Sequence, residues 1–289
     1  MLFRSYNYHS DSSLMARRPP ALEEFRPEPP WRGTGVLGTT ATSTKSDQWG
    51  NDLVTGNNLL ALFGLENVAG FEAIIPTWTV TYAVAAGAAL SPAGRTLQYT
   101  KLDSALLDFV GLRDVWLPSA IPLPSRFRIT RDYGSVAHFE NRAALPRARF
   151  APQVRVVPNA VEAETLLRRP DYDTKAEIVI ESDHPLLTSS EGTVSWLGRT
   201  TDVLVLAVAA KQPSVLVVAD TDYPGWEATV DGAVTPILRA NLAFRAVEVP
   251  AGSHRVEFRY RPAAKRQGAV ASAFFLFLSL AAARWWRPR

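Results

Sequence analysis

Residues 214–232, Ser-Val-Leu-Val-Val-Ala-Asp-Thr-Asp-Tyr-Pro-Gly-Trp-Glu-Ala-Thr-Val-Asp-Gly, and residues 249–262, Val-Pro-Ala-Gly-Ser-His-Arg-Val-Glu-Phe-Arg-Tyr-Arg-Pro, decide the fold class. In both stretches, short apolar runs are separated by Pro-Gly, Asp-Gly or Pro-Ala-Gly turn sequences. Val256, Phe258 and Tyr260 alternate with charged residues, which predicts a strand with one buried and one wet face.

Similar signals recur from residue 149 onward at a short, regular spacing. The further candidate strands are Val154–Val157, Ala176–Ile180, Gly192–Gly198, Asp202–Ala209, Ser214–Ala219, Trp226–Val230, Ala243–Val249 and His254–Tyr260. Short strands at this spacing predict an all-β sandwich or jelly-roll-like domain over residues 151–262.

The preceding residues differ in character. Residues 1–50 are rich in Pro, Gly, Ser and Thr and are predicted to be partly disordered. Residues 51–150 are predicted to form a mixed α/β subdomain, so that the fold class is α+β followed by all-β. Its expected elements are helices at Asn57–Leu65, Thr77–Ala89 and Leu102–Val110, a strand at Asp114–Leu117, and a hairpin of Phe127–Thr130 with Val136–Glu140.

An apolar run, Gly268–Ala283, closes the chain and is followed by Arg284-Trp-Trp286. At ~1.5 Å per residue a helix over this stretch matches the ~30 Å hydrocarbon core of a bilayer. We therefore predict a transmembrane helix at residues 267–286 and a basic tail at 287–289, with a buried amphipathic helix as the alternative. Basic residues flank both ends and give only a slight preference for a cytoplasmic C-terminus.

Composition excludes several classes of protein. The 289 residues suggest about two domains, and the formal net charge of +3 is too small to indicate nucleic-acid binding. The absence of cysteine removes disulfides, thiolate metal sites and cysteine nucleophiles. Residues 1–10 lack the apolar core of a signal peptide. If the chain is complete, we expect it to be tail-anchored with its domain in the cytoplasm. If it is a piece of a longer membrane protein, the same domain could lie outside the cytoplasm.

Candidate chemistry is sparse. Asp220, Asp222, Glu227 and Asp231 crowd one stretch and are of the type that serves glycoside hydrolysis or calcium binding, but turn formation explains them better. The four histidines show no metal-ligand spacing, and no cofactor motif is convincing. We predict no catalytic residue, no metal and no cofactor.

Aromatic side chains are the remaining candidates. Tyr223, Trp226 and Trp196 on a sandwich could stack on sugar rings, although core packing is the more ordinary role for such residues, especially for Trp226.

These residues resemble a known family. Residues 222–232, 239–262 and the helix after them are similar to the C-terminal end of the bacterial YfhO-like membrane proteins. Residues 58–72, 106–117 and 139–147 follow the order of the same family, so the resemblance covers roughly residues 50–286.

The resemblance implies a GT-C-type glycosyltransferase: many transmembrane helices, a lipid-linked sugar donor, and an extracytoplasmic C-terminal domain closed by a last helix. The catalytic acids of that class lie in an N-terminal membrane bundle that has no counterpart here, so none is carried over. We expect a non-catalytic, extracytoplasmic domain in the bacterial cell membrane, with membrane lipid, and a multi-helix glycosyltransferase subunit or a glycan, as partners. The alternatives are a stand-alone, tail-anchored carbohydrate-binding or protein-interaction module and a hydrolase that uses the 220–231 carboxylates.

Overall fold

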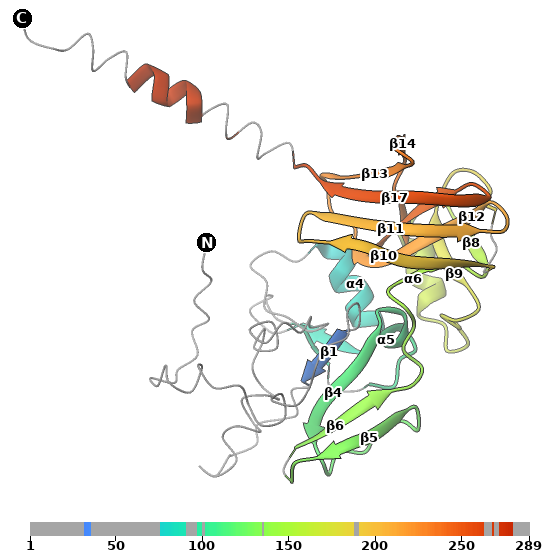
Figure 1. The fold of residues 1–289 in the computed structure, drawn as a ribbon. Helices are drawn as coiled ribbons and strands as arrows, with labels where there is room; N and C mark the ends of the chain where they lie inside the picture. The colour runs from blue at the N-terminus through green and yellow to red at the C-terminus, as the bar shows by residue number, and fades with distance from the viewer. Residues whose placement is uncertain are drawn as a thin grey trace, which may run out of the picture. The chain divides into compact units, whose positions relative to one another are not determined.

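The computed structural model describes residues 32–35, 76–90, 97–99, 102–134, 136–187, 191–262, 268 and 272–279 (Figure 1). It divides the chain into two units, residues 1–147 and 148–289. The predicted helix at Asn57–Leu65 and the predicted basic tail at 287–289 lie outside the described residues.

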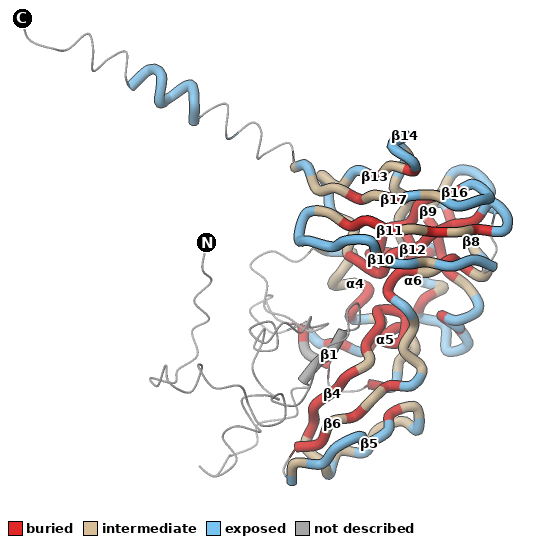
Figure 2. Tube along the Cα trace, in the orientation of Figure 1, coloured by how far each residue is buried: buried red, intermediate tan, exposed pale blue. Residues whose placement is uncertain are grey.

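The first unit is built on a four-stranded sheet in the order β1-β4-β6-β5. These strands are β1 (Arg32–Gly35), β4 (Leu112–Pro118), β5 (Phe127–Asp132) and β6 (Val136–Asn141). The predicted strand and hairpin are thus present, and β5 pairs antiparallel with β6. β1 pairs parallel with β4 and lies inside the segment for which we predicted partial disorder. Five of the six residues of β5 are exposed, which suits an edge strand (Figure 2).

The two helices among the described residues of this unit are shorter than predicted. α4 (Thr77–Ala85) ends before Gly87, whose φ of 93° turns the chain into the hairpin of β2 (Ala88–Leu90) and β3 (Leu97–Tyr99). α5 keeps only Leu106–Phe109, because Gly111 at φ 71° redirects the backbone into β4. The apolar spacing of residues 102–110 therefore reflects the burial of these side chains and not a helix over the whole stretch.

The second unit is a β-sandwich of two sheets. One sheet has the order β10-β11-β17-β13-β14 and the other β7-β12-β16-β15-β9-β8. The strands of the first are β10 (Gly192–Arg199), β11 (Val203–Ala210), β13 (Trp226–Val230), β14 (Ala233–Thr235) and β17 (Gly252–Tyr260). Those of the second are β7 (Ala148–Phe150), β8 (Val154–Val157), β9 (Ile178–Glu181), β12 (Ser214–Thr221), β15 (Leu238–Ala240) and β16 (Phe244–Val249).

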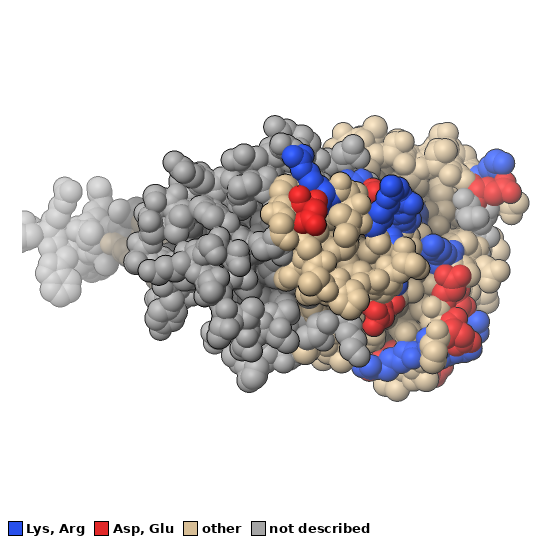
Figure 3. Space-filling model, turned by 90° about the horizontal axis from the view of Figure 1, so that it is seen from below, with Lys and Arg blue, Asp and Glu red and all other residues tan. Residues whose placement is uncertain are grey.

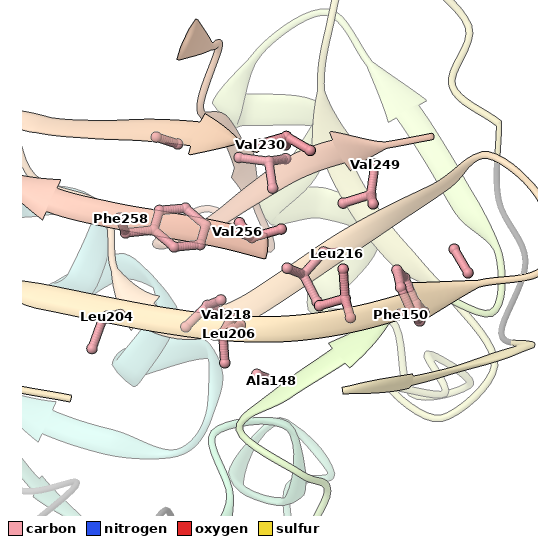
Figure 4. Packing of buried hydrophobic residues seen from close by; sticks show 14 residues of the cluster. Ala148, Phe150, Leu204, Leu206, Leu216, Val218, Val230, Val249, Val256 and Phe258 are labelled. Carbon is pink, nitrogen blue, oxygen red and sulfur yellow. The ribbon is translucent and has the colours of Figure 1, made fainter. Parts of the chain in front are cut away.

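Alternating residues of both sheets meet in one apolar core (Figure 4). Leu204 and Leu206 of β11 and Leu216 and Val218 of β12 belong to this core, and these residues are at most 2% exposed. Because successive side chains on a strand point to opposite sides, every second residue enters this core. The alternation of apolar and polar residues in the sequence therefore identifies the side chains that fill the core between the two sheets.

One feature departs from an all-β domain. β8 and β9 are parallel and are joined by helix α6 (Ala160–Leu167), which packs against both strands. Asn159 caps this helix by accepting a hydrogen bond from the Glu162 amide at 3.0 Å. A parallel pair needs such a crossover, so the prediction of an all-β domain over residues 151–262 was wrong at this point.

The predicted transmembrane helix is only partly described. Gly268 and residues 272–279 are helical, and the described side chains of this segment are exposed (Figures 1 and 2). Within the described part of the chain, no helix has the length and apolar character needed to cross a membrane.

Candidate functional site

A surface hollow of about 400 Å³ lies at the edge of the sandwich where the chain passes from β14 to β15. Its lining comprises residues 222–228, Val234, Thr235, Ile237 and Arg239. Two of the three predicted aromatic candidates, Tyr223 and Trp226, are therefore part of one site, together with carboxylates and a guanidinium.

The loop before β13 is shaped by glycine. Gly225 has a φ of 107°, and a Cβ at this position would lie 3.0 Å from the Pro262 Cα atom. The Arg261 amide donates a hydrogen bond of 2.6 Å to the Gly225 carbonyl, and the Trp226 amide donates one of 3.3 Å to the Tyr223 carbonyl. The Pro-Gly-Trp sequence thus fastens the hollow to the end of β17.

Three aromatic rings are grouped beside this loop. Trp226 stands opposite Tyr260 in the β13–β17 register, with ring centroids 5.4 Å apart. Tyr223 lies 6.5 Å from Tyr260 and is 40% exposed, whereas Trp226 is half-buried. Tilted pairs at these distances are favourable aromatic contacts. The cluster runs from the core outward and ends in an exposed tyrosine.

A buried cation holds Trp226 from the core side. The Arg245 guanidinium lies 3.7 Å from the centroid of the Trp226 ring and forms an ion pair with the Asp220 carboxylate at 3.3 Å. The side chains of Arg245 and Asp220 are 2% and 9% exposed. A desolvated cation–π contact of this kind orients the indole, so Trp226 is both a core residue and a wall of the hollow.

The polar end of the hollow is an ion-pair cluster. Arg239 donates to the Asp222 carboxylate at 3.3 Å and lies 3.9 Å from the Glu181 carboxylate. Burial raises the pKa of Glu181, and Arg239 opposes that shift. Glu227, also in the lining, pairs with Arg261 at 3.4 Å. The hollow therefore offers carboxylate acceptors and guanidinium donors around an aromatic wall.

The four crowded carboxylates do not converge on one reaction centre. Asp220 is in the core with Arg245, Asp222 and Glu227 are at the hollow, and Asp231 lies in the β13–β14 turn. Asp220, Asp222 and Glu227 each form an ion pair with an arginine, and Asp231 lies 2.7 Å from His254 Nδ1. Within the described ranges, no group of three or more His, Cys, Asp and Glu side chains could hold a metal ion.

Asp231 forms its turn in an unexpected way. Its Oδ1 atom accepts the Arg255 amide at 2.7 Å and its Oδ2 atom accepts His254 Nδ1 at 2.7 Å. The Arg255 amide is the main reason that the pKa of Asp231 lies below its usual range. The carboxylate in turn raises the pKa of His254, whose Nε2 atom faces the Ala251 carbonyl. The residue thus fastens β17 rather than bonding its own backbone.

Trp196 is not brought to the hollow. It lies on β10, opposite Leu206, and packs against the core, with the Arg199 guanidinium 5.8 Å from its ring. β11 and β17 separate β10 from β13, so the strands that carry the two tryptophans are roughly 14 Å apart at ~4.8 Å per strand, and the register also offsets the two residues along the strands.

A second polar cluster lies in the first unit. The His138 ring stacks on Trp116 at 4.8 Å, and its Nε2 atom donates to Asp114 at 3.0 Å. Its Nδ1 atom lies 2.6 Å from the Thr130 hydroxyl, which also lies 3.2 Å from the His138 carbonyl. These contacts link β4, β6 and β5 and serve as a cross-strand network.

Arg239, Arg245 and Tyr260 are site residues that sequence reasoning missed. An arginine inside the apolar stretch 243–249 was the signal for Arg245, because a buried charge requires partners. Acidic and basic side chains are also interspersed over the face of the molecule in Figure 3. Among the described residues on that face, neither sign of charge forms a patch of its own.

Comparison with known families matches part of the chain. The family model described as bacterial membrane protein YfhO matches residues 198–272, which confirms the predicted resemblance over a shorter range than residues 50–286. The matched stretch contains the hollow, its aromatic cluster and the start of the apolar run. No curated protein and no solved structure matches the chain.

Proposed function

We propose that this chain provides a membrane-anchored, non-catalytic extracytoplasmic domain of a YfhO-like, glycosyltransferase-type membrane protein that acts in bacterial cell-envelope glycosylation. The observation that carries the proposal is the extent of the YfhO match, which joins strands β11–β17 of the sandwich to the apolar run in one segment. A domain that is continuous with an apolar run is suited to work at the membrane surface, and the apolar run is proposed to be its transmembrane anchor.

The hollow is the proposed contact with a saccharide. An aromatic side chain that is partly exposed, with carboxylate and guanidinium groups beside it, suits a sugar ring that has one apolar face and several hydroxyls. Tyr223 is the exposed aromatic contact, and Trp226 is the inner wall. Trp196 remains a predicted contact at a separate place on β10.

Topology is the first test. The chain carrying an epitope tag after Met1 is produced in a bacterium, and spheroplasts are treated with an external protease. We expect the domain to be digested in intact spheroplasts and the apolar run to stay with the membrane after alkaline extraction. Full protection of the domain until the membrane is lysed would refute an extracytoplasmic location.

Saccharide contact is the second test. The full chain in mild detergent is applied to immobilised cell-envelope polysaccharides, and Tyr223→Ala is compared with the wild type. Loss of one stacking partner is expected to weaken binding by roughly tenfold, which corresponds to about 1–1.5 kcal/mol of binding free energy. Leu187→Ala is the matched control, because Leu187 is also exposed, at 66%, and lies outside the hollow. Equal effects of both substitutions would refute the site.

A stand-alone carbohydrate-binding or protein-interaction module is the second candidate function. The mixed aromatic and charged lining of the hollow favours it independently of the family match. Saccharide binding that is unchanged when no glycosyltransferase subunit is present in the cell would favour this candidate.

A further inference from the structure

The end of β17 is held close to the apolar run by a short length of chain. β17 ends at Tyr260, and only residues 263–267 lie between Pro262 and Gly268. A fully extended chain spans at most ~3.3–3.6 Å per residue, so the six steps from Pro262 to Gly268 reach no more than roughly 22 Å. If the apolar run lies in a bilayer, as proposed above, this end of the sandwich cannot be far from the headgroups.

The side chains at this end of the sandwich are aromatic or basic. Tyr223, Trp226 and Tyr260 form the aromatic cluster, and Tyr223 is 40% exposed. Arg261 follows directly, with a side chain that is 62% exposed. We call these four residues the aromatic end of the sandwich.

This set of groups fits the membrane interface. Tyrosine and tryptophan have an apolar body and a polar tip, and they concentrate at the headgroup level of membrane proteins. Arginine pairs with phosphate oxygens through its planar fork of donors. Lys265 and Arg266 add two more positive charges in the adjoining sequence. Each basic residue near an anionic surface contributes about 1 kcal/mol of attraction.

Helix α6, which lies away from the end of β17 in Figure 1, does not carry this combination. Its Val161 is 73% exposed, but the charged neighbours Glu164 and Arg168 pair with each other at 2.8 Å. The Arg261–Glu227 pair is longer, at 3.4 Å, and both partners are more than half exposed, so a phosphate can compete for Arg261.

We propose that the aromatic end docks on the phospholipid headgroup region and thereby fixes the orientation of the sandwich relative to the membrane. The proposal rests on the proposed membrane insertion of the apolar run. In the docked state the Tyr223 ring enters the headgroup layer, and Arg261 leaves Glu227 for a lipid phosphate. The neighbouring hollow then opens beside the membrane surface.

The absence of cysteine makes a direct test simple. Three single-cysteine variants of the full chain, Tyr223→Cys, Val161→Cys and Phe275→Cys, are labelled with an environment-sensitive fluorophore. They are reconstituted into phosphatidylcholine vesicles, with and without phosphatidylglycerol, that contain a spin-labelled quencher lipid. Phe275→Cys reports insertion of the apolar run, Tyr223→Cys reports docking, and Val161→Cys is the distal control.

The expected result is strong quenching at positions 275 and 223 and little at 161. Adding Arg261→Ala to Tyr223→Cys is expected to lower the ratio of docked to undocked protein in phosphatidylglycerol vesicles about fivefold, the equivalent of ~1 kcal/mol. Arg168→Ala, which removes an exposed arginine on α6, is the matched control and should change nothing.

The outcomes separate the two proposals. Quenching at 275 without quenching at 223 overturns docking and leaves the anchored domain standing. Lack of quenching at 275 overturns both the anchor and the docking that depends on it. A response at 223 to soluble envelope polysaccharide, with none to lipid, identifies the aromatic end as a saccharide surface and overturns docking.

Discussion

Replacing Arg245 tests the role of the buried cation beneath the hollow. Arg245 is 2% exposed, pairs with Asp220 at 3.3 Å and covers the Trp226 ring at 3.7 Å. Arg245→Met keeps the length and apolar packing of the side chain but removes its charge. Removing one partner of a buried ion pair costs about 3–5 kcal/mol, because it leaves the other charge in the core. We expect a loss near the middle of that range, about 4 kcal/mol, since the cation–π contact is lost as well.

Chemical denaturation of the full chain in mild detergent, followed by circular dichroism, measures this loss. Asp220→Asn is expected to cost a similar amount, and the double variant less than the sum of the two, with a coupling of about 2 kcal/mol. Arg168→Met is the control, because its surface pair with Glu164 contributes at most about 0.5 kcal/mol. A loss below about 1 kcal/mol for Arg245→Met, or additive single effects, would show that the pair does not hold the core.

The remaining predictions concern the turns. Gly225→Ala should destabilise the chain by about 1–3 kcal/mol because of its φ of 107° and the close Pro262 backbone, whereas Gly198→Ala, with nothing within 4 Å, should be tolerated in thermal unfolding. Asn241→Ala should cost about 2–3 kcal/mol in the same assay, since its fully buried Oδ1 atom accepts two hydrogen bonds. His254→Gln should lower the melting temperature below pH ~6.5, because the pairing of protonated His254 with Asp231 then stabilises the folded state. The difference in melting temperature should become smaller as the pH rises through the elevated pKa of His254, and a pH-independent difference would contradict this.

Much of the sandwich could be predicted because its strands carry a local signal. The alternation of Val256, Phe258 and Tyr260 with charged residues follows from one face in the core and one in water. Helix α6 was missed because eight residues between strands give a weak periodic signal, although Asn159 and Glu162 have the spacing of a helix cap.

The site was predictable only in part. Tyr223 and Trp226 were proposed as aromatic side chains on a sandwich that could stack on sugar rings, and both line the hollow. Tyr260 is brought opposite Trp226 by the pairing of β13 with β17, which are distant in sequence, whereas Arg239 and Arg245 lie opposite each other in the β15–β16 hairpin. Arg245 left a signal, since it is a charge inside an apolar stretch, but the sequence did not indicate which residues it contacts.

The position of β17 has a mechanical consequence. It is the strand from which the chain continues toward the apolar run, and it lies in the middle of its sheet, with eight register pairs to β11 and five to β13. A pull on the chain beyond Pro262 would therefore load many backbone hydrogen bonds together, along the strand, instead of peeling an edge strand one bond at a time. The domain is built to carry tension through its C-terminal end without unravelling.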